Sequence, residues 1–183
     1  MKSIREDHPL RRLFKGLVEN AFCTEVGLCD PALTDYLIDL LVNFVRLDEL
    51  YALRDAAGRR LDQVAAMLAS LTCGTDGVRG EDELLVYRHI GDFALFWSGV
   101  YPEHLRHSRG IAFKDRLLDY VQQGKRSYGI ASRLANENAS PPASLFGRLS
   151  SEFEFCCHGL GLVRRGWEQT DPATCHRATT LLY

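Results

Sequence analysis

The sequence lacks an apolar run long enough to cross a membrane, since its most apolar stretch is the short island Phe93–Trp97. Its N-terminus, MKSIREDHPLRR, is charged where a secretory signal would be apolar, so we expect neither a membrane span nor export. An excess of positive charge is also missing, because 22 Lys and Arg stand against 24 Asp and Glu, for a formal net charge of −2. A nucleic-acid-binding protein would need a basic face, so we expect no nucleic-acid partner.

Several signatures of catalysis and metal binding are absent as well. The chain has no Gly-x-Ser-x-Gly nucleophile motif, no phosphate-binding loop ending in Lys-Ser/Thr and no Glu-x-x-His pair of a di-iron protein. The six cysteines include no Cys-x-x-Cys pair and no zinc-like spacing, so we expect reduced thiols in a cytoplasmic protein. These absences argue against a nucleotide-binding enzyme or a hydrolase with a common sequence signature.

The chain does contain helical periodicity in every long segment, and no segment alternates in the way of a β-strand. The clearest start signal is Asp30 followed by Pro31, an N-cap residue before a proline at the first helical position. We expect helices over residues 8–22, 31–46, 60–71, 82–100, 113–135 and 145–167, and a loose tail over 171–183. The prediction is therefore all-α: one domain over residues 1–183, a globular bundle of six or seven helices.

The most apolar segment, HIGDFALFWSGVYPEHL (residues 89–105), opens with a histidine and an aspartate three residues apart. On a helical projection His89 lies inside the apolar arc and Asp92 at its border. Small residues occupy much of the opposite face, which predicts a central helix packed closely on both sides. Gly124, in the apolar arc of the helix at 113–135, is likewise expected to let a neighbouring backbone approach.

Three acid–base candidates could meet inside this bundle: His89, Asp92 and Glu152, with Tyr120 or Tyr128 within reach. The favoured interpretation is structural, with the Asp92 carboxylate fixing the His89 tautomer so that neither group is buried without a partner. One alternative makes His89 the ligand of a haem or metal cofactor, tuned by Asp92 or Glu152. Another is a hydrolase that uses His89 and Asp92, which requires a water-filled cavity beside the histidine. No cofactor is predicted.

The segment Ser98–Gly110, SGVYPEHLRHSRG, interrupts the helices and is the preferred binding region, because loops between rigid helices commonly carry binding surfaces. The stretch GKRSYG (124–129) could line the same cleft. The candidate binding residues are Tyr101, Glu103, His104, Lys125, Arg126 and Tyr128. His104 and His107 could chelate a metal, but the pair lacks a third ligand, which favours surface histidines.

Two segments, RHIGDFALFWSGVYPEHL and DYVQQGKRSYGIAS, together resemble an uncharacterised family of bacterial all-helical hypothetical proteins. In that family a Gly-Asp-x-x-Leu-Phe helix ends in Pro-Glu and precedes a Tyr-x-x-x-Gly-x-x-x-Tyr helix. The resemblance implies a bacterial cytoplasmic protein and carries no activity, substrate or cofactor. From the residues, the first hypothesis is a non-enzymatic module that binds a partner protein, a second copy of itself or a small ligand.

Overall fold

The computed structural model describes residues 8–44, 80–106 and 113–182, together with Leu53, Val64, Met67 and Leu68. These ranges contain helices and no strand, which confirms the predicted all-α class. The α-helices are α1 (Pro9–Glu19), α2 (Pro31–Phe44), α5 (Gly80–Gly99), α6 (Phe113–Leu134), α7 (Ala143–Ser151), α8 (Phe153–Thr170) and α9 (Pro172–Leu182). A π-helix, η1 (Asn20–Val26), continues α1, and a 3-10 helix, η2 (Pro102–Arg106), follows α5.

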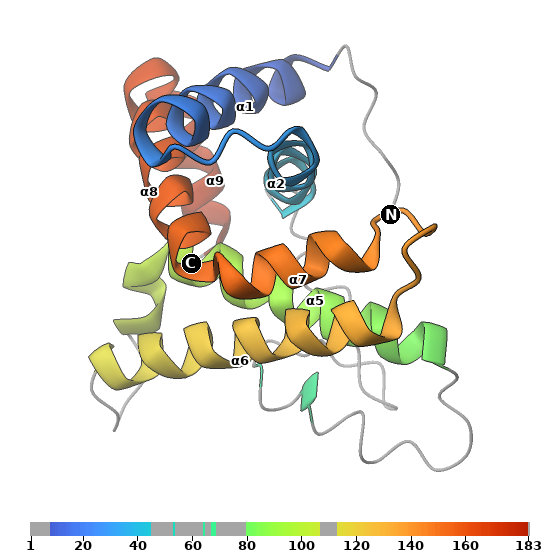
Figure 1. Ribbon diagram of the computed structural model, residues 1–183. Coiled ribbons are helices and arrows are strands. Elements are labelled where there is room, and N and C mark those ends of the chain that lie inside the picture. Colours follow the sequence, from blue (N-terminus) through green and yellow to red (C-terminus); the bar gives the residue numbers. More distant parts are fainter. Residues whose placement is uncertain are drawn as a thin grey trace.

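Helix α5 lies at the centre of the bundle, where it contacts α6, α8, α2 and η2. Figure 1 shows α5, α6 and α7 across the lower half of the molecule, with α8 rising from one end of them and α1 crossing above. Every residue from Ile90 to Tyr101 is buried, as predicted for a central helix. None of the helices in the described ranges has the length and apolar character that a membrane span requires.

Glycines that face aromatic rings let α6 pack closely against both α5 and α8. A Cβ atom added at Gly124 on α6 would stand 2.3 Å from Cζ of Phe153. A Cβ at Gly91 on α5 would stand 2.7 Å from the ring of Tyr128. The atoms nearest to the Cβ at Gly124 are the ring of Phe153 and, at 3.0 Å, the Cβ of Ala94 on α5, so α5 and α6 pack closely at Gly124, as predicted.

Gly99, on another face of α5, does admit a backbone. A Cβ there would lie 3.2 Å from Cα of Cys157 on α8. Close packing on that face of α5 is thus confirmed, and it brings the first turns of α8 against the end of the central helix.

Helix starts follow the Asp-Pro signal at two places in the chain. At α2, the backbone N–H of Ala32 donates to Oδ1 of Asp30 at 2.9 Å, which confirms the predicted N-cap. At α9, the N–H of Thr174 donates to Oδ1 of Asp171 at 3.2 Å. The expected loose tail is therefore wrong over Pro172–Leu182, because Asp171 caps a helix that buries Cys175 against the core.

The helix expected over residues 145–167 is two helices, α7 and α8, with a break at Glu152. Glu152 has φ −98° and ψ 18°, outside the helical region, and Ser151 Oγ donates to the carbonyl of Arg148. The break places Leu149 in the core from α7 and Phe153 in the core from α8. Of the helix expected at 60–71, Val64, Met67 and Leu68 are described, and its other residues lie outside the described ranges.

The helix expected over residues 8–22 changes character at Asn20, where α1 passes into η1. The chain then reverses at Gly27, whose φ of 79° is the left-handed conformation that glycine adopts without strain. This reversal brings the Cα atoms of Cys23 and Cys29 to 4.5 Å, and the two residues form a disulfide. The expectation of reduced thiols is therefore wrong for this pair, although Cys156, Cys157 and Cys175 are free thiols.

Candidate functional site

The carboxylate of Asp92 joins three helices through hydrogen bonds. Its Oδ1 atom accepts from the hydroxyl of Tyr36 on α2 at 2.5 Å and from the hydroxyl of Tyr128 on α6 at 2.7 Å. Arg88, one turn earlier on α5, donates from Nε to the Tyr36 hydroxyl at 3.2 Å. The same Nε lies 3.7 Å from Asp92 Oδ2. We call Arg88, Asp92, Tyr36 and Tyr128 the Asp92 cluster.

Burial sets the protonation of the Asp92 cluster. Desolvation raises the pKa of Asp92 above its ordinary value of 3.8, while Arg88 and the two hydroxyls act in the opposite direction. Desolvation also raises the pKa of Tyr36 and of Tyr128 well above 10.0, and the nearby carboxylate adds to both shifts. Both tyrosines therefore remain hydroxyl donors at neutral pH, and neither supplies a phenolate base.

Aromatic rings enclose the Asp92 cluster. The ring of Phe146 on α7 lies 6.1 Å from that of Tyr36, edge to face, and 6.3 Å from that of Tyr128, stacked. The Arg88 guanidinium lies 5.4 Å from the centre of the Tyr36 ring. Gly91, just before Asp92, leaves the space in which the Tyr128 ring passes across α5. Gly91 thus leaves room for the Tyr128 ring, and the Asp92 carboxylate accepts the hydrogen bond of its hydroxyl.

The structure does not place His89 and Glu152 with Asp92 as the sequence suggested. The His89 ring lies 6.0 Å from that of Phe44 and 6.4 Å from that of Phe93. No hydrogen bond or ion pair between described residues joins His89 or Glu152 to Asp92. Asp92 thus meets the two tyrosines, while the His89 ring meets Phe44 and Phe93.

Of the two tyrosines considered within reach of Asp92, Tyr128 bonds to it, and Tyr120 instead packs against Phe93 at 6.5 Å. Sequence reasoning missed Tyr36 and Arg88. Arg88 precedes Asp92 by four residues, a spacing that places the two side chains on one helix face and could have been used. Nothing comparable marks Tyr36, which lies in a helix that is apolar on most sides.

No three His, Cys, Asp or Glu side chains in the described ranges gather closely enough to hold a metal ion. The side chain of His104 and the whole of His107 lie outside the described residues, so that pair stays a prediction. The role of His89 as a haem or metal ligand likewise stays a prediction.

The candidate binding residues divide between the core and the surface. Tyr101 and Tyr128 are fully buried and belong to the core. Lys125 pairs with Glu154, Nζ lying 2.8 and 3.0 Å from the two carboxylate oxygens. Arg126 is exposed on the outer face of α6.

Arg164 on α8 holds the start of the Ser98–Gly110 segment. Its Nη1 donates to the carbonyl of Val100 at 2.8 Å and forms an ion pair with Glu103 in η2. Its Nε donates to Glu168 at 2.8 Å. The guanidinium also lies 4.5 Å from the centre of the buried Tyr101 ring. Arg164 was not among the candidates, because nothing in its own segment marks it.

The free thiols of α8 are poor nucleophiles. Burial raises the pKa of Cys156 to about 12, and burial likewise raises that of Cys157 to about 12. The Sγ atom of Cys157 lies 3.3 Å from Oγ of Ser98 on α5. At neutral pH both side chains are therefore protonated and serve as apolar core residues.

Comparison with known proteins adds no relative, since no protein family model, no curated protein and no solved structure matches the chain. The function is therefore argued from the geometry of the molecule.

The raised pKa of Asp92 predicts a pH dependence of stability. Between its ordinary value of 3.8 and its higher value in the folded protein, the folded state binds more protons than the unfolded state. The free energy of unfolding should then fall as the pH rises through this window and level off above it. Urea unfolding measured across acidic pH should show this slope in the wild type, and Asp92→Asn should lose it.

Glu154→Gln is the matched control. The hydrogen bond from Lys125 lowers the pKa of Glu154, so its contribution has the opposite sign and disappears as the pH falls. Parallel pH profiles for the wild type and Asp92→Asn would contradict the assignment.

Proposed function

We propose that this protein is a non-enzymatic helical module that binds a partner protein or a small ligand at the surface around Ser98–Gly110. The observation that carries the proposal is the attachment of η2 to α8 through Arg164, which contacts Val100, Glu103 and Tyr101. A cytoplasmic setting belongs to the same proposal and rests on the sequence resemblance.

The internal polar groups support a structural rather than a catalytic use of the core. The Asp92 carboxylate is occupied by two hydroxyls that stay protonated. The thiols of Cys156 and Cys157 are held protonated by burial. A general base or nucleophile needs a pKa near the working pH, and the pKa values of the two hydroxyls and the two thiols are shifted away from it.

The surface at η2 has the features of a binding site built on a rigid support. Arg164 and Tyr101 fix η2 against α8. A ligand would therefore meet a segment that is already ordered, which lowers the entropy cost of binding. The Glu103 and Glu168 side chains remain 33% and 47% exposed. Two carboxylates surround one guanidinium, so this rim favours a ligand that presents a positively charged group.

Site-specific photo-cross-linking tests the proposal. A benzophenone amino acid at position 168 leaves the pair between Arg164 and Glu103 in place, and the same residue at position 137 lies on the exposed loop after α6. Illumination in the native cell should give a discrete adduct from position 168 and none from position 137. Intact-mass analysis then separates a partner protein, a second copy of the chain and a small ligand.

A second variant ties the adduct to the η2 surface. Adding Arg164→Ala to the position-168 protein should reduce the adduct, because η2 loses its attachment to α8. Equal labelling from positions 168 and 137, or an adduct that is indifferent to Arg164→Ala, would overturn the proposed site.

A further inference from the structure

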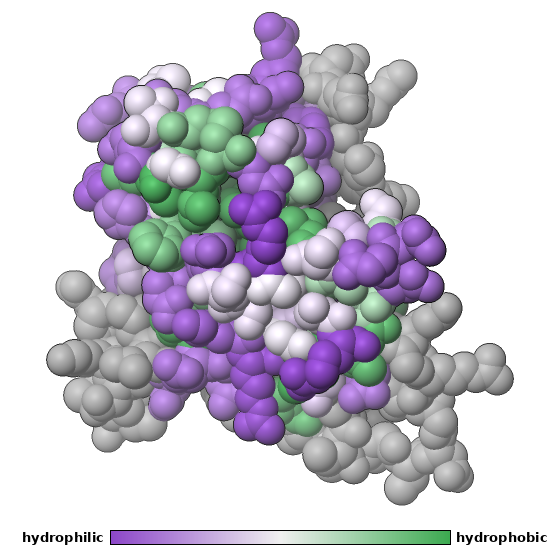
Figure 2. Space-filling view, in the orientation of Figure 1, coloured by the Kyte–Doolittle hydropathy of each residue, from purple (hydrophilic) through white to green (hydrophobic). Residues whose placement is uncertain are grey.

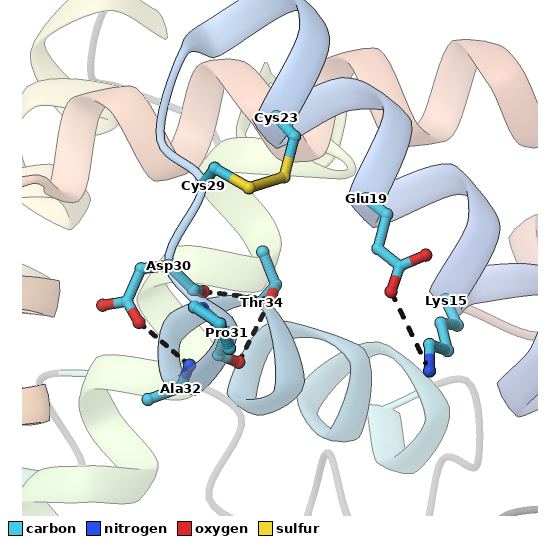
Figure 3. Close-up of a disulfide and its surroundings, with 8 residues drawn as sticks. All are labelled: Lys15, Glu19, Cys23, Cys29, Asp30, Pro31, Ala32 and Thr34. Atoms are coloured by element: carbon cyan, nitrogen blue, oxygen red, sulfur yellow. Dashed lines mark hydrogen bonds and ion pairs between the residues drawn. A yellow bond between two sulfur atoms is a disulfide. The ribbon is translucent and has the colours of Figure 1, made fainter.

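The Cys23–Cys29 disulfide lies at the surface, between the end of η1 and the start of α2 (Figure 3). Both cysteines are exposed, whereas Cys156 and Cys175 are buried. The half-buried Val26 and Leu28 lie within the loop that the disulfide closes. Figure 2 shows hydrophobic surface in the region where Figure 1 places η1 and α8. A thiol reagent can therefore reach this sulfur pair in the folded protein.

The loop closed by the disulfide has further supports that do not depend on sulfur. The N–H of Leu28 donates to the carbonyl of Phe22 at 2.9 Å, and the N–H of Gly27 donates to the same carbonyl. Phe22 itself is fully buried beside Gly159 of α8. Opening the disulfide would therefore leave η1 anchored, and its effect would fall on the residues between η1 and α2, which would lose a tether.

Those residues form the N-terminal cap of α2. Cys29 immediately precedes Asp30, whose Oδ1 accepts from the N–H of Ala32 and whose backbone carbonyl accepts from the N–H and the hydroxyl of Thr34. Figure 3 shows the sulfur bridge and these cap contacts side by side. The Oδ2 atom of Asp30 also pairs with Arg148 on α7. The disulfide thus tethers the cap of the helix that carries Tyr36 into the Asp92 cluster.

We propose that Cys23–Cys29 is a thiol–disulfide exchange site, at which a dithiol reductant opens the bond and loosens the start of α2. A thiolate of the reductant attacks Sγ of Cys23, forming a mixed disulfide, and the electron pair of the broken bond goes to Sγ of Cys29. The second thiol of the reductant then displaces Cys23 and closes the disulfide of the reductant. The protein gains two electrons and two protons, and the dithiol loses them.

Cys29 is the better leaving group of the two sulfurs. It stands just before the N-terminus of α2, where the positive end of the helix dipole stabilises a thiolate. The neighbouring Asp30 carboxylate would repel a thiolate at Cys29, but its ion pair with Arg148 weakens that repulsion. Cys23 lies within η1, three residues before its C-terminal end, and so lacks the support of a helix N-terminus.

Differential alkylation of the folded full-length protein tests the exchange. The protein is purified without reductant, treated with graded dithiothreitol, alkylated with iodoacetamide and mapped by peptide mass spectrometry. We expect Cys23 and Cys29 to be linked before treatment and alkylated after it, while the buried Cys156 and Cys175 stay unlabelled. Alkylation of Cys23 and Cys29 before reduction, or a bond that opens only in urea, would overturn the proposal.

Amide hydrogen exchange tests the structural consequence. The amides of Ala32 and Thr34 should exchange several-fold faster in the reduced protein, while the amide of Ala135, which bonds to Ala131 at the end of α6, keeps its rate. The double variant Cys23→Ser/Cys29→Ser should exchange like the reduced protein and should not respond to dithiothreitol. Equal rates at Ala32 and Thr34 in both redox states would overturn the coupling to α2.

Discussion

Asp92→Ala is expected to lower the free energy of unfolding by about 3–5 kcal/mol. The substitution removes the acceptor of two hydroxyls that are buried in different helices, Tyr36 in α2 and Tyr128 in α6. Each hydroxyl left without an acceptor costs about 1–3 kcal/mol. Urea unfolding followed by circular dichroism measures the loss.

Two further variants interpret that loss. Asp92→Asn keeps an oxygen that can accept from the tyrosines, so it should cost less than Asp92→Ala. Asp119→Ala removes an exposed carboxylate from α6 and should change stability by about 0.5 kcal/mol or less. A loss at Asp92→Ala no larger than at Asp119→Ala would contradict a structural role for the Asp92 cluster.

Gly124→Ala is expected to destabilise the protein by about 1–3 kcal/mol, against the helix propensity of alanine. The new Cβ would stand 2.3 Å from Cζ of Phe153 and 3.0 Å from Cβ of Ala94. The Phe153 ring is fully buried, so to move away it must displace other core side chains or lose its contacts with them. Chemical unfolding of the purified variant measures the effect.

Gly16→Ala is the matched control, because Gly16 lies on the exposed side of α1 with no atom within 4 Å of the added Cβ. There the propensity gain acts alone and should stabilise the protein by about 0.5–1 kcal/mol. Adding Phe153→Leu to Gly124→Ala should recover part of the loss, since the smaller side chain gives way. A change of the same sign at Gly16 and Gly124 would contradict the glycine–ring contact.

The sequence predicts elements where local chemistry decides them. Asp30 and Pro31 gave the start of α2, and the apolar period gave α5 and α6. The same Asp-Pro signal at Asp171 does not by itself predict α9, because the residues after it lack a clear apolar face. No glycine or proline beside Glu152 marks the break between α7 and α8. The break lets both Leu149 and Phe153 enter the core, a tertiary contact that the local sequence does not show.

The polar cluster was predicted only in part, because its bonds join residues far apart in sequence. The position of Asp92 at the border of the apolar arc could be projected from a single helix. Tyr36 lies 56 residues away, and no helical projection of one segment shows which partner helix it meets. His89 and Glu152 were grouped with Asp92 for the same reason, since periodicity gives a face and not a contact.

The central claim is that Asp92 holds α2 and α6 to α5 through the two tyrosine hydroxyls. Its most direct test is a double-mutant cycle, in which Tyr128→Phe is measured by urea unfolding in the wild type and in Asp92→Ala. We expect a cost of about 0.5–1.5 kcal/mol or more in the wild type. In Asp92→Ala the same change should cost nothing or stabilise the protein, because the hydroxyl has already lost its acceptor. An equal cost in both backgrounds would contradict the claim.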